Sequence, residues 1–318
     1  MGSSGILGLG SAAMDHVLRC DDLPRQDGFA LVLDEQILPG GSCANVLAAA
    51  ANLGTPASLV AKMGDDTYGR AFKADLERSA VSGEFLILEK GGASLHTFIT
   101  VARDGSKAIF VHMGSSLSLS VEEVHEGMLD GKGVYFTDMI PAPPALKLAR
   151  LASSRDLTVV FHVEVAPSFM DLCGISRREI HEMLALSNLV IGSMGALTEL
   201  AGREDPVEAA WTLKTLYEPS LGVVSTMGGN GAVWVTSERD DTLLVPAYQV
   251  RTVDTTGAGD AFAAGLLHAF FSARLDRRVS MEFASACAAI KCTQWGPRLK
   301  AKESDVWSFL QTASSRGN

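Results

Sequence analysis

Short apolar runs alternate along the chain with longer segments in which apolar residues recur every three or four positions. The short runs, several of them rich in valine and isoleucine, are typical of buried parallel strands and span 59–63, 133–137, 158–163, 189–193 and 222–226. The longer segments predict helices over 68–80, 143–153, 177–186 and 206–217. This alternation predicts an α/β fold with a doubly wound, mostly parallel sheet and functional loops at the carboxyl ends of its strands.

Two segments, about 14–38 and 94–113, interrupt this alternation. Each has the pattern of two strands joined by a turn, and in the second the turn is Arg-Asp-Gly-Ser at 103–106. We therefore expect a small β-sheet, separate from the main one, to be built from these two insertions.

Composition narrows the function classes. Hydrophobic residues make up 47% of the 318 residues, which is enough for a large core, and no apolar run is long enough to span a bilayer. The formal net charge of -10 argues against nucleic acid or an anionic membrane surface as the main partner. The five cysteines include no Cys-x-x-Cys pair, and the N-terminus lacks the pattern of a secretory signal. We expect a cytoplasmic protein.

The turn Gly257-Ala258-Gly259-Asp260, at the start of a long apolar helix, combines two chemical functions. Its first three residues have almost no side chain to obstruct an anion, and their N–H groups lie where the first helical turn leaves donors unpaired. The positive end of the helix dipole attracts a phosphate and keeps Asp260 ionised, as a general base must be. The structural alternative is an ordinary helix start, capped by Thr255 or Thr256, in which Asp260 only complements the dipole.

A second glycine pair precedes an alanine-rich helix near the other end of the chain. Gly40 and Gly41 allow the backbone to approach a small polar ligand, and Asn45 offers both a donor and an acceptor at the start of the helix. We expect Ser42 to be the N-cap. The structural alternative is a tight turn into a helix whose alanines pack closely against the sheet.

Together these two motifs resemble those of the ribokinase-like family of sugar kinases. The resemblance implies that Gly257, Ala258 and Gly259 bind the transferring phosphoryl group and that Asp260 deprotonates the acceptor hydroxyl. It also implies that Asp15, with Gly40, Gly41 and Asn45, binds the sugar. Further matches follow in the family's order at 6–11, 22–24, 61–69 and 226–231. We interpret residues 1–318 as one kinase domain, with the two insertions forming a lid over the sugar.

The resemblance also implies the cofactors and the assembly. ATP would lie on the loop that contains Thr226, Gly228, Gly229 and Gly231, with Ser285 near the adenine, where relatives often have asparagine. Magnesium is expected with ATP, and a monovalent cation such as potassium is expected near Asp254. Relatives often pair through the outer face of the lid, so we expect a homodimer.

One part of the family's pattern is missing. The Asn-x-x-Glu motif that organises magnesium is replaced, with Ser193 and Ala196 at its two characteristic positions. Glu199 lies one helical turn further on, and spacing does not decide whether it reaches the metal. The metal ligands therefore stay unassigned, with Glu199 and Asp254 as the candidates. His162 and Glu164, near the end of a predicted strand, are further candidates for ligand contact. The sequence does not decide whether His96, Phe98 and His112 line the sugar pocket or lie on the surface.

Two other nucleotide-binding patterns can be excluded. Gly8-Leu9-Gly10-Ser11-Ala12-Ala13 fits a relaxed dinucleotide fingerprint, but residues 14–28 indicate strand and turn instead of the required helix. The segment 127–133 has one residue too few for a phosphate-binding P-loop and no Ser or Thr after Lys132.

The sequence therefore predicts an enzyme that phosphorylates a hydroxyl group of a small sugar or sugar derivative with ATP. Two alternatives stay open, because the fold alone does not identify a substrate. One is an adenosine-like nucleoside kinase, and the other is a non-catalytic sugar-sensing protein on the same fold.

Overall fold

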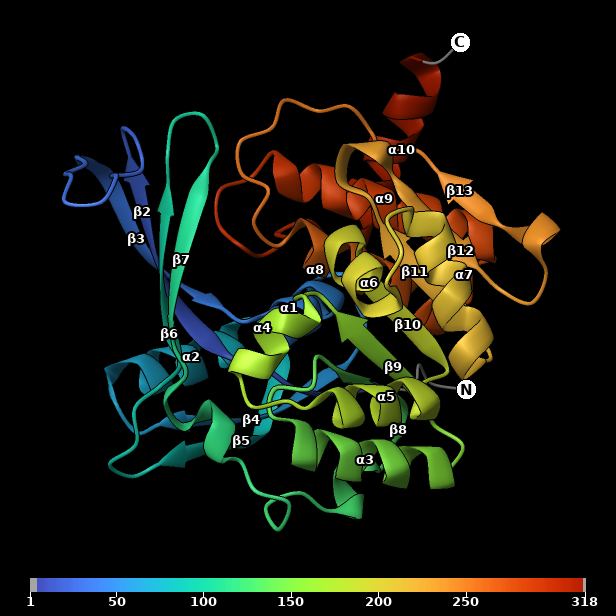
Figure 1. Cartoon of the computed structure of the whole chain (residues 1–318), viewed down its shortest axis with the longest axis horizontal. Helices are drawn as coiled ribbons and strands as arrows, with labels where there is room; N and C mark the ends of the chain where they lie inside the picture. The colour runs from blue at the N-terminus through green and yellow to red at the C-terminus, as the bar shows by residue number, and fades with distance from the viewer. Residues whose placement is uncertain (1–4, 317–318) are drawn as a thin grey trace.

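A sheet of nine strands forms the centre of the computed structural model, which describes residues 5–316 (Figure 1). Its strands are, in spatial order, β13 (Leu243–Val245), β12 (Ala232–Val235), β11 (Gly222–Thr226), β10 (Leu189–Ser193), β9 (Thr158–Val163), β8 (Lys132–Thr137), β1 (Gly5–Leu9), β4 (Ala57–Gly64) and β5 (Val81–Glu89). The seven strands from β11 to β5 are parallel, while β12 and β13 are antiparallel additions at one edge. The doubly wound, mostly parallel sheet predicted from the sequence is confirmed.

Helices cover both faces of this sheet. One face carries α1 (Ser42–Asn52), α2 (Thr67–Arg78), α8 (Ala258–Leu266), α9 (Arg277–Cys292) and α10 (Glu303–Arg316). The other carries α3 (Ala142–Ser154), α4 (Pro167–Leu172), α5 (Arg177–Leu186), α6 (Met194–Ala201) and α7 (Pro206–Tyr217). Successive residues of β1 alternate between the two layers, with Ile6 in the first core and Leu7 in the second. This two-sided burial explains why the central strands are continuous apolar runs.

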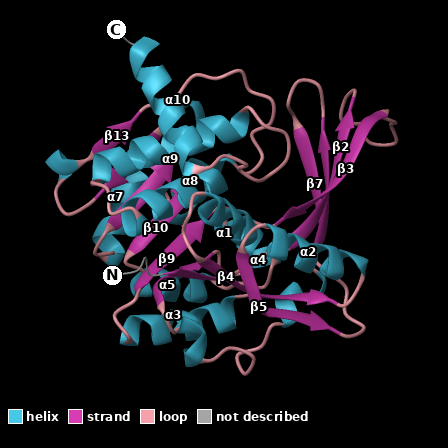
Figure 2. Ribbon diagram, turned by 180° about the vertical axis from the view of Figure 1, so that it is seen from behind, coloured by secondary structure: helices cyan, strands magenta, loops and turns pink. Residues whose placement is uncertain are grey.

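The predicted small sheet stands apart from the main sheet, at the left of Figure 1 and at the right in the reverse view of Figure 2. Its strands, in spatial order, are β3 (Val32–Gly40), β2 (Ala13–Cys20), β6 (His96–Val101) and β7 (Lys107–His112). Both insertions recognised in the sequence thus contribute a pair of strands. The parallel pairing of β2 with β6 joins the two pairs into one sheet.

The sequence missed three strands of the large sheet. Most of β5 is only half-buried at the sheet edge, so it lacks the continuous apolar run of the central strands. The antiparallel strands β12 and β13 are only 4 and 3 residues long, too short for a periodicity to be recognised.

Helix starts also differ from the expectation in one place. Gly41, with φ 88°, is the N-cap of α1, and Ser42 is already the first helical residue, so the assignment of Ser42 as N-cap is wrong. Positive φ is accessible to glycine, and the hydroxyl of Ser42 is thereby free for a tertiary contact.

Within residues 5–316, none of the helices combines the length and the apolar character needed to cross a bilayer.

Candidate active site

Two cavities of about 510 Å³ and 530 Å³ lie on opposite sides of the turn that starts α8. We name them, after the ligands that the sequence leads us to expect there, the nucleotide pocket and the acceptor pocket. Both have the size of small-molecule sites. Residues of the turn divide between them: Ala258 and Gly259 line the nucleotide pocket, and Gly257 and Asp260 line the acceptor pocket. Glu164 lines both. The turn is thus the wall between two ligand-sized spaces.

Steric contacts explain why the turn needs glycine. Gly257 is the N-cap of α8 with φ 76°, and a Cβ there would lie 1.8 Å from the carbonyl oxygen of Pro297. A Cβ on Gly259 would lie 2.8 Å from a carboxylate oxygen of Glu164. No side chain caps α8, so neither Thr255 nor Thr256 has the capping role of the structural alternative. Ala258 N donates to the Thr255 carbonyl oxygen at 3.2 Å, whereas the N–H groups of Gly257, Gly259 and Asp260 have no partner among the described hydrogen bonds and are available to an anion.

Asp260 is buried in the acceptor pocket and accepts two hydrogen bonds. Ser42 Oγ donates to its Oδ1 at 2.7 Å, and Asn45 Nδ2 donates to its Oδ2 at 2.9 Å. Burial and, next, the negative charge of Glu164 raise the pKa of Asp260 to about 6, while His162 and the two hydrogen bonds oppose this shift. A carboxylate with that pKa is ionised near neutral pH yet is a stronger base than an ordinary aspartate.

The orientation of Asn45 is itself determined by a partner that the sequence did not reveal. Arg298 donates from Nε to Asn45 Oδ1 at 3.1 Å and forms an ion pair with Asp75 of α2. Because the Asn45 oxygen is occupied by this donor, its amide nitrogen faces Asp260. Arg298 carries no local motif, so only the fold identifies it.

His162 in β9 and Glu164, directly after β9, form a cluster with Asp260 in which one ligand atom of each residue lies within 4.8 Å of the others. Glu164 Oε2 is buried and 3.4 Å from His162 Nε2, without hydrogen-bond geometry. Burial disfavours the charged form of His162, but its interaction with Glu164 and the nearby carboxylates raise its pKa overall. The cluster therefore contains a carboxylate oxygen, Glu164 Oε2, that has no hydrogen-bond partner among the described residues and belongs to a side chain bordering both pockets.

Asp15, on β2 of the small sheet, lines the acceptor pocket together with Asp260 of α8. Its Oδ1 accepts a hydrogen bond of 2.7 Å from Thr97 Oγ1, and burial raises its pKa. Gly41 and Asn45 also line this pocket. Gly40 does not; a Cβ there would lie 1.9 Å from Asp15 Oδ2, so Gly40 makes room for the carboxylate.

Asp138, directly after β8, is the fourth carboxylate that lines the acceptor pocket, and no motif in the sequence points to it. It accepts hydrogen bonds from Ser11 N at 3.1 Å, Ser11 Oγ at 2.5 Å, Cys43 N at 3.1 Å and Ile140 N at 3.2 Å. These bonds join the end of β1 to the start of α1, so Asp138 holds the helix that carries Ser42 and Asn45 in place.

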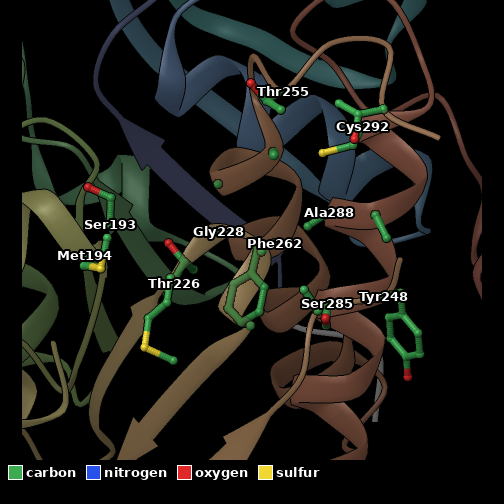
Figure 3. Close-up of a pocket in the computed structure, with 18 of the residues that line it drawn as sticks. Ser193, Met194, Thr226, Gly228, Tyr248, Thr255, Phe262, Ser285, Ala288 and Cys292 are labelled. Carbon is green, nitrogen blue, oxygen red and sulfur yellow. The ribbon is translucent and has the colours of Figure 1, made fainter. Parts of the chain in front are cut away.

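All five residues assigned to the nucleotide from the sequence line the nucleotide pocket: Thr226, Gly228, Gly229, Gly231 and Ser285. Figure 3 shows Ser193, Met194 and Thr226 on one side of Phe262, with Ser285, Ala288 and Cys292 on α9 at the other side. Ser285 Oγ donates to the Pro246 carbonyl at 3.0 Å.

Neither candidate magnesium ligand lines a pocket. Glu199 accepts hydrogen bonds from Ser168 N at 2.8 Å and Ser168 Oγ at 3.0 Å and pairs with Arg177. Asp254 pairs with Lys291. The carboxylate that does face the nucleotide pocket is Glu164.

Comparisons with known proteins cover almost the whole chain. The chain matches the pfkB family carbohydrate kinases over residues 4–304. It is 30% identical over 306 residues, covering 96% of this chain and 97% of the relative, to an ATP-dependent ribose-1-phosphate kinase of Halopiger xanaduensis.

Solved structures show the same fold. A ribokinase of Thermotoga maritima superposes with a TM-score of 0.81 at 22% identity, covering 96% of this chain and 99% of that one. A ribokinase of Arabidopsis thaliana in complex with ribose and ATP superposes with a TM-score of 0.81 at 19% identity, covering 98% and 99%. Matched along almost its whole length, the chain belongs to the pfkB family of carbohydrate kinases.

Proposed function

We propose that this enzyme transfers the γ-phosphoryl group of ATP to a hydroxyl group of a small sugar or sugar derivative, with Asp260 as the general base. One observation carries the proposal: the turn Gly257–Asp260 separates two ligand-sized pockets, with an acceptor-side carboxylate next to free helix N–H groups. A group transferred across that wall passes directly over the N-terminus of α8.

Each side chain then has a defined task. Residues Thr226, Gly228, Gly229, Gly231 and Ser285 bind ATP, and its γ-phosphate lies on the turn of Gly257, Ala258 and Gly259, where the N–H groups of Gly257 and Gly259 have no partner among the described hydrogen bonds. Asp15, Gly41 and Asn45 hold the acceptor. Asp260 takes the proton of the attacking hydroxyl. The transition state demands little covalent chemistry, so positioning and charge neutralisation supply most of the acceleration.

Magnesium would be held by Glu164. Its buried Oε2 has no hydrogen bond among the described residues, and the side chain borders both pockets, so the donor suits a hard cation that accompanies phosphates. When bound, magnesium neutralises charge on the phosphate oxygens. Glu199 and Asp254 do not fit this role because they line neither pocket and their carboxylates already have other partners.

The lining of the acceptor pocket favours an uncharged acceptor. Four carboxylates line it (Asp15, Asp138, Glu164 and Asp260), and no Lys or Arg does among the residues described. A phosphorylated sugar would meet this negative potential without a lysine or arginine to pair with its phosphate, and the one histidine of the lining, His162, already lies beside Glu164. The substrate of the Halopiger relative is therefore not carried over to this chain.

A nucleoside is the second candidate acceptor, and a specific observation favours it. Beside the polar groups, the pocket has an extended apolar lining that a ribose alone would not cover, including Leu95, Ile99, Ile140, Phe169 and Met170. A ribose hydroxyl at Asp260 with the base against these side chains would fill both parts. A purely sugar-sensing role leaves the free helix start and the raised pKa of Asp260 without a purpose.

An ADP-release assay against a panel of acceptors tests the function. The panel contains ribose, fructose, gluconate, ribose 1-phosphate and purine and pyrimidine nucleosides. We expect turnover with a neutral sugar or a nucleoside and at least about tenfold lower kcat/KM with the phosphosugar, the factor that corresponds to 1.4 kcal/mol. Preference for the phosphosugar contradicts the assignment of an uncharged acceptor, and no acceptor-dependent ADP release contradicts the kinase assignment.

We also propose a homodimer that forms through the small sheet. Apolar side chains exposed on it and on its β2–β3 loop, among them Phe29, Leu31, Ile37, Phe98 and Phe110, support this assembly. His96 and His112 stack on the same face as Phe98, away from Thr97 and the acceptor pocket. Light scattering of the wild type and Phe110→Asp tests the dimer, which the aspartate charge introduced at position 110 should disrupt.

A cytoplasmic location is proposed as well, supported by five free cysteines and the use of ATP.

A further inference from the structure

Lys291, on α9, is completely buried and has no task in the mechanism above. Its Nζ donates to the carbonyl oxygen of Asp254 at 2.8 Å and to that of Gln294 at 3.3 Å, and lies 3.7 Å from Asp254 Oδ2. A buried ammonium group is costly unless it is paired and hydrogen-bonded, and here it is both.

The three oxygens around Nζ form the kind of set that binds a small cation: two backbone carbonyls and one carboxylate. The resemblance to sugar kinases implies an exchangeable monovalent cation near Asp254. The residues at this place do not fit one, because the ammonium group of Lys291 already occupies the oxygens that would bind it. The positive charge is thus part of the chain.

Asp254 links this charge to the catalytic turn. Its Oδ1 accepts a hydrogen bond of 2.9 Å from Thr256 N, directly before Gly257, and its Oδ2 accepts one of 3.1 Å from Gly296 N. Gly257 in turn packs against the carbonyl of Pro297. Lys291 therefore ties the loop that enters α8 to the loop that follows α9, and both loops border the acceptor pocket.

We propose that Lys291 is a built-in cation that replaces the exchangeable monovalent ion and positions the turn Gly257–Asp260 for phosphoryl transfer. The inference rests on the proposed kinase function, and it makes the activity independent of potassium. Lys291 lines neither pocket and contacts none of the reacting groups. It is therefore a positioning residue and not a catalytic one.

The test compares the wild type with Lys291→Met, which keeps the length of the side chain and removes its charge. Lys132→Met is the matched control, because Lys132 is a half-buried lysine at the opposite end of the strands, bonded only to Ser58 Oγ at 2.7 Å in the described hydrogen bonds. Each protein is assayed with tetramethylammonium as the sole monovalent cation and again with potassium or ammonium chloride. Thermal melting is measured under the same conditions.

The wild type and Lys132→Met should show the same kcat and melting temperature with and without potassium. Lys291→Met should lose at least about tenfold in kcat without potassium, since it leaves Asp254 buried and unpaired, and potassium or ammonium should restore part of it. Potassium should also raise the melting temperature of this variant alone. A merely structural lysine would give no rescue by potassium.

Activation of the wild type by potassium, or potassium-independent full activity of Lys291→Met, overturns the proposal. If Lys291→Met does not fold, Lys291→Gln and the cation dependence of the wild type decide it. The melting experiment needs no turnover, so it separates failure of this inference from failure of the proposed function.

Discussion

Asn45 Nδ2 donates a hydrogen bond of 2.9 Å to Asp260 Oδ2, although 215 positions separate the two residues in the chain. The bond joins the start of α1 to the start of α8, and Ser42 adds a second bond to the same carboxylate. Both donors stabilise ionised Asp260, whereas burial and Glu164 favour its protonated form. The balance of these effects motivates the following predictions.

Replacing Asp260 with Asn should reduce kcat by ~10² to 10⁴-fold while ATP and acceptor binding stay nearly intact, because a general base acts in the transition state. Steady-state kinetics and calorimetric titration with each ligand measure the two effects. Asp240→Asn, at an exposed carboxylate, is the control and should behave as the wild type. Wild-type turnover in Asp260→Asn would remove Asp260 from its proposed role.

Asp15→Ala should raise the acceptor KM at least about tenfold and leave the KM for ATP within about threefold. The reason is that Asp15 lines only the acceptor pocket, where its carboxylate can accept bonds from acceptor hydroxyls. Asp15→Asn, which keeps an oxygen for Thr97, should have a smaller effect. An increase mainly in the KM for ATP would mean that the two pockets have been assigned to the wrong ligands.

Activity should require a divalent cation, and Glu164→Gln should raise the magnesium concentration for half-maximal activity at least about tenfold. Glu199→Gln is the matched control, because Glu199 faces Ser168 and Arg177 outside both pockets. Titration of magnesium at constant ATP measures the effect. Full activity of the wild type in metal-free buffer with a chelator, or an equal shift in both variants, speaks against Glu164 as the ligand.

The pH dependence of kcat/KM should show an acid limb near pH 6. Only ionised Asp260 can accept the proton of the hydroxyl, and burial followed by the charge of Glu164 raises its pKa to about 6. Activity is therefore expected to fall tenfold per pH unit well below that value. A profile that stays flat down to about pH 5 would show that no group with this pKa is needed.

The same raised pKa predicts an effect on stability. Folded Asp260 has a pKa of about 6, above its ordinary 3.8, so the native state binds this proton more tightly than the unfolded chain. Its ionisation lowers the free energy of unfolding as the pH rises through the window between those values. At pH values above that window, Asp260→Asn should therefore raise the free energy of unfolding by an amount of the order of 1 to 3 kcal/mol.

Thermal melting of the wild type and Asp260→Asn at pH 5 and pH 8 tests this sign. Relative to the wild type, the variant should be more stable at pH 8 than at pH 5, by a few degrees in melting temperature. An equal difference at both pH values would mean that Asp260 titrates in the folded protein as an ordinary carboxyl group does.

Local patterns were sufficient for the architecture and for locating the turn Gly257–Asp260 to which we assign the phosphoryl group. Buried parallel strands need continuous apolar runs and a tight anion-binding turn needs glycine, so both requirements are visible in adjacent residues. Gly257, Gly259 and Asp260 are examples, and so are the two insertions that form the small sheet. For the same reason the short edge strands β12 and β13 were missed.

The tertiary structure alone decided which polar groups meet. Arg298 orients Asn45, Lys291 pairs with Asp254, and Glu164 borders both pockets. Spacing did not decide whether Glu199 can reach a metal ion, and the packing of α6 directs its carboxylate to Ser168 and Arg177. A side chain's partners depend on how distant strands and helices pack, and that information is absent from the few residues around any one position.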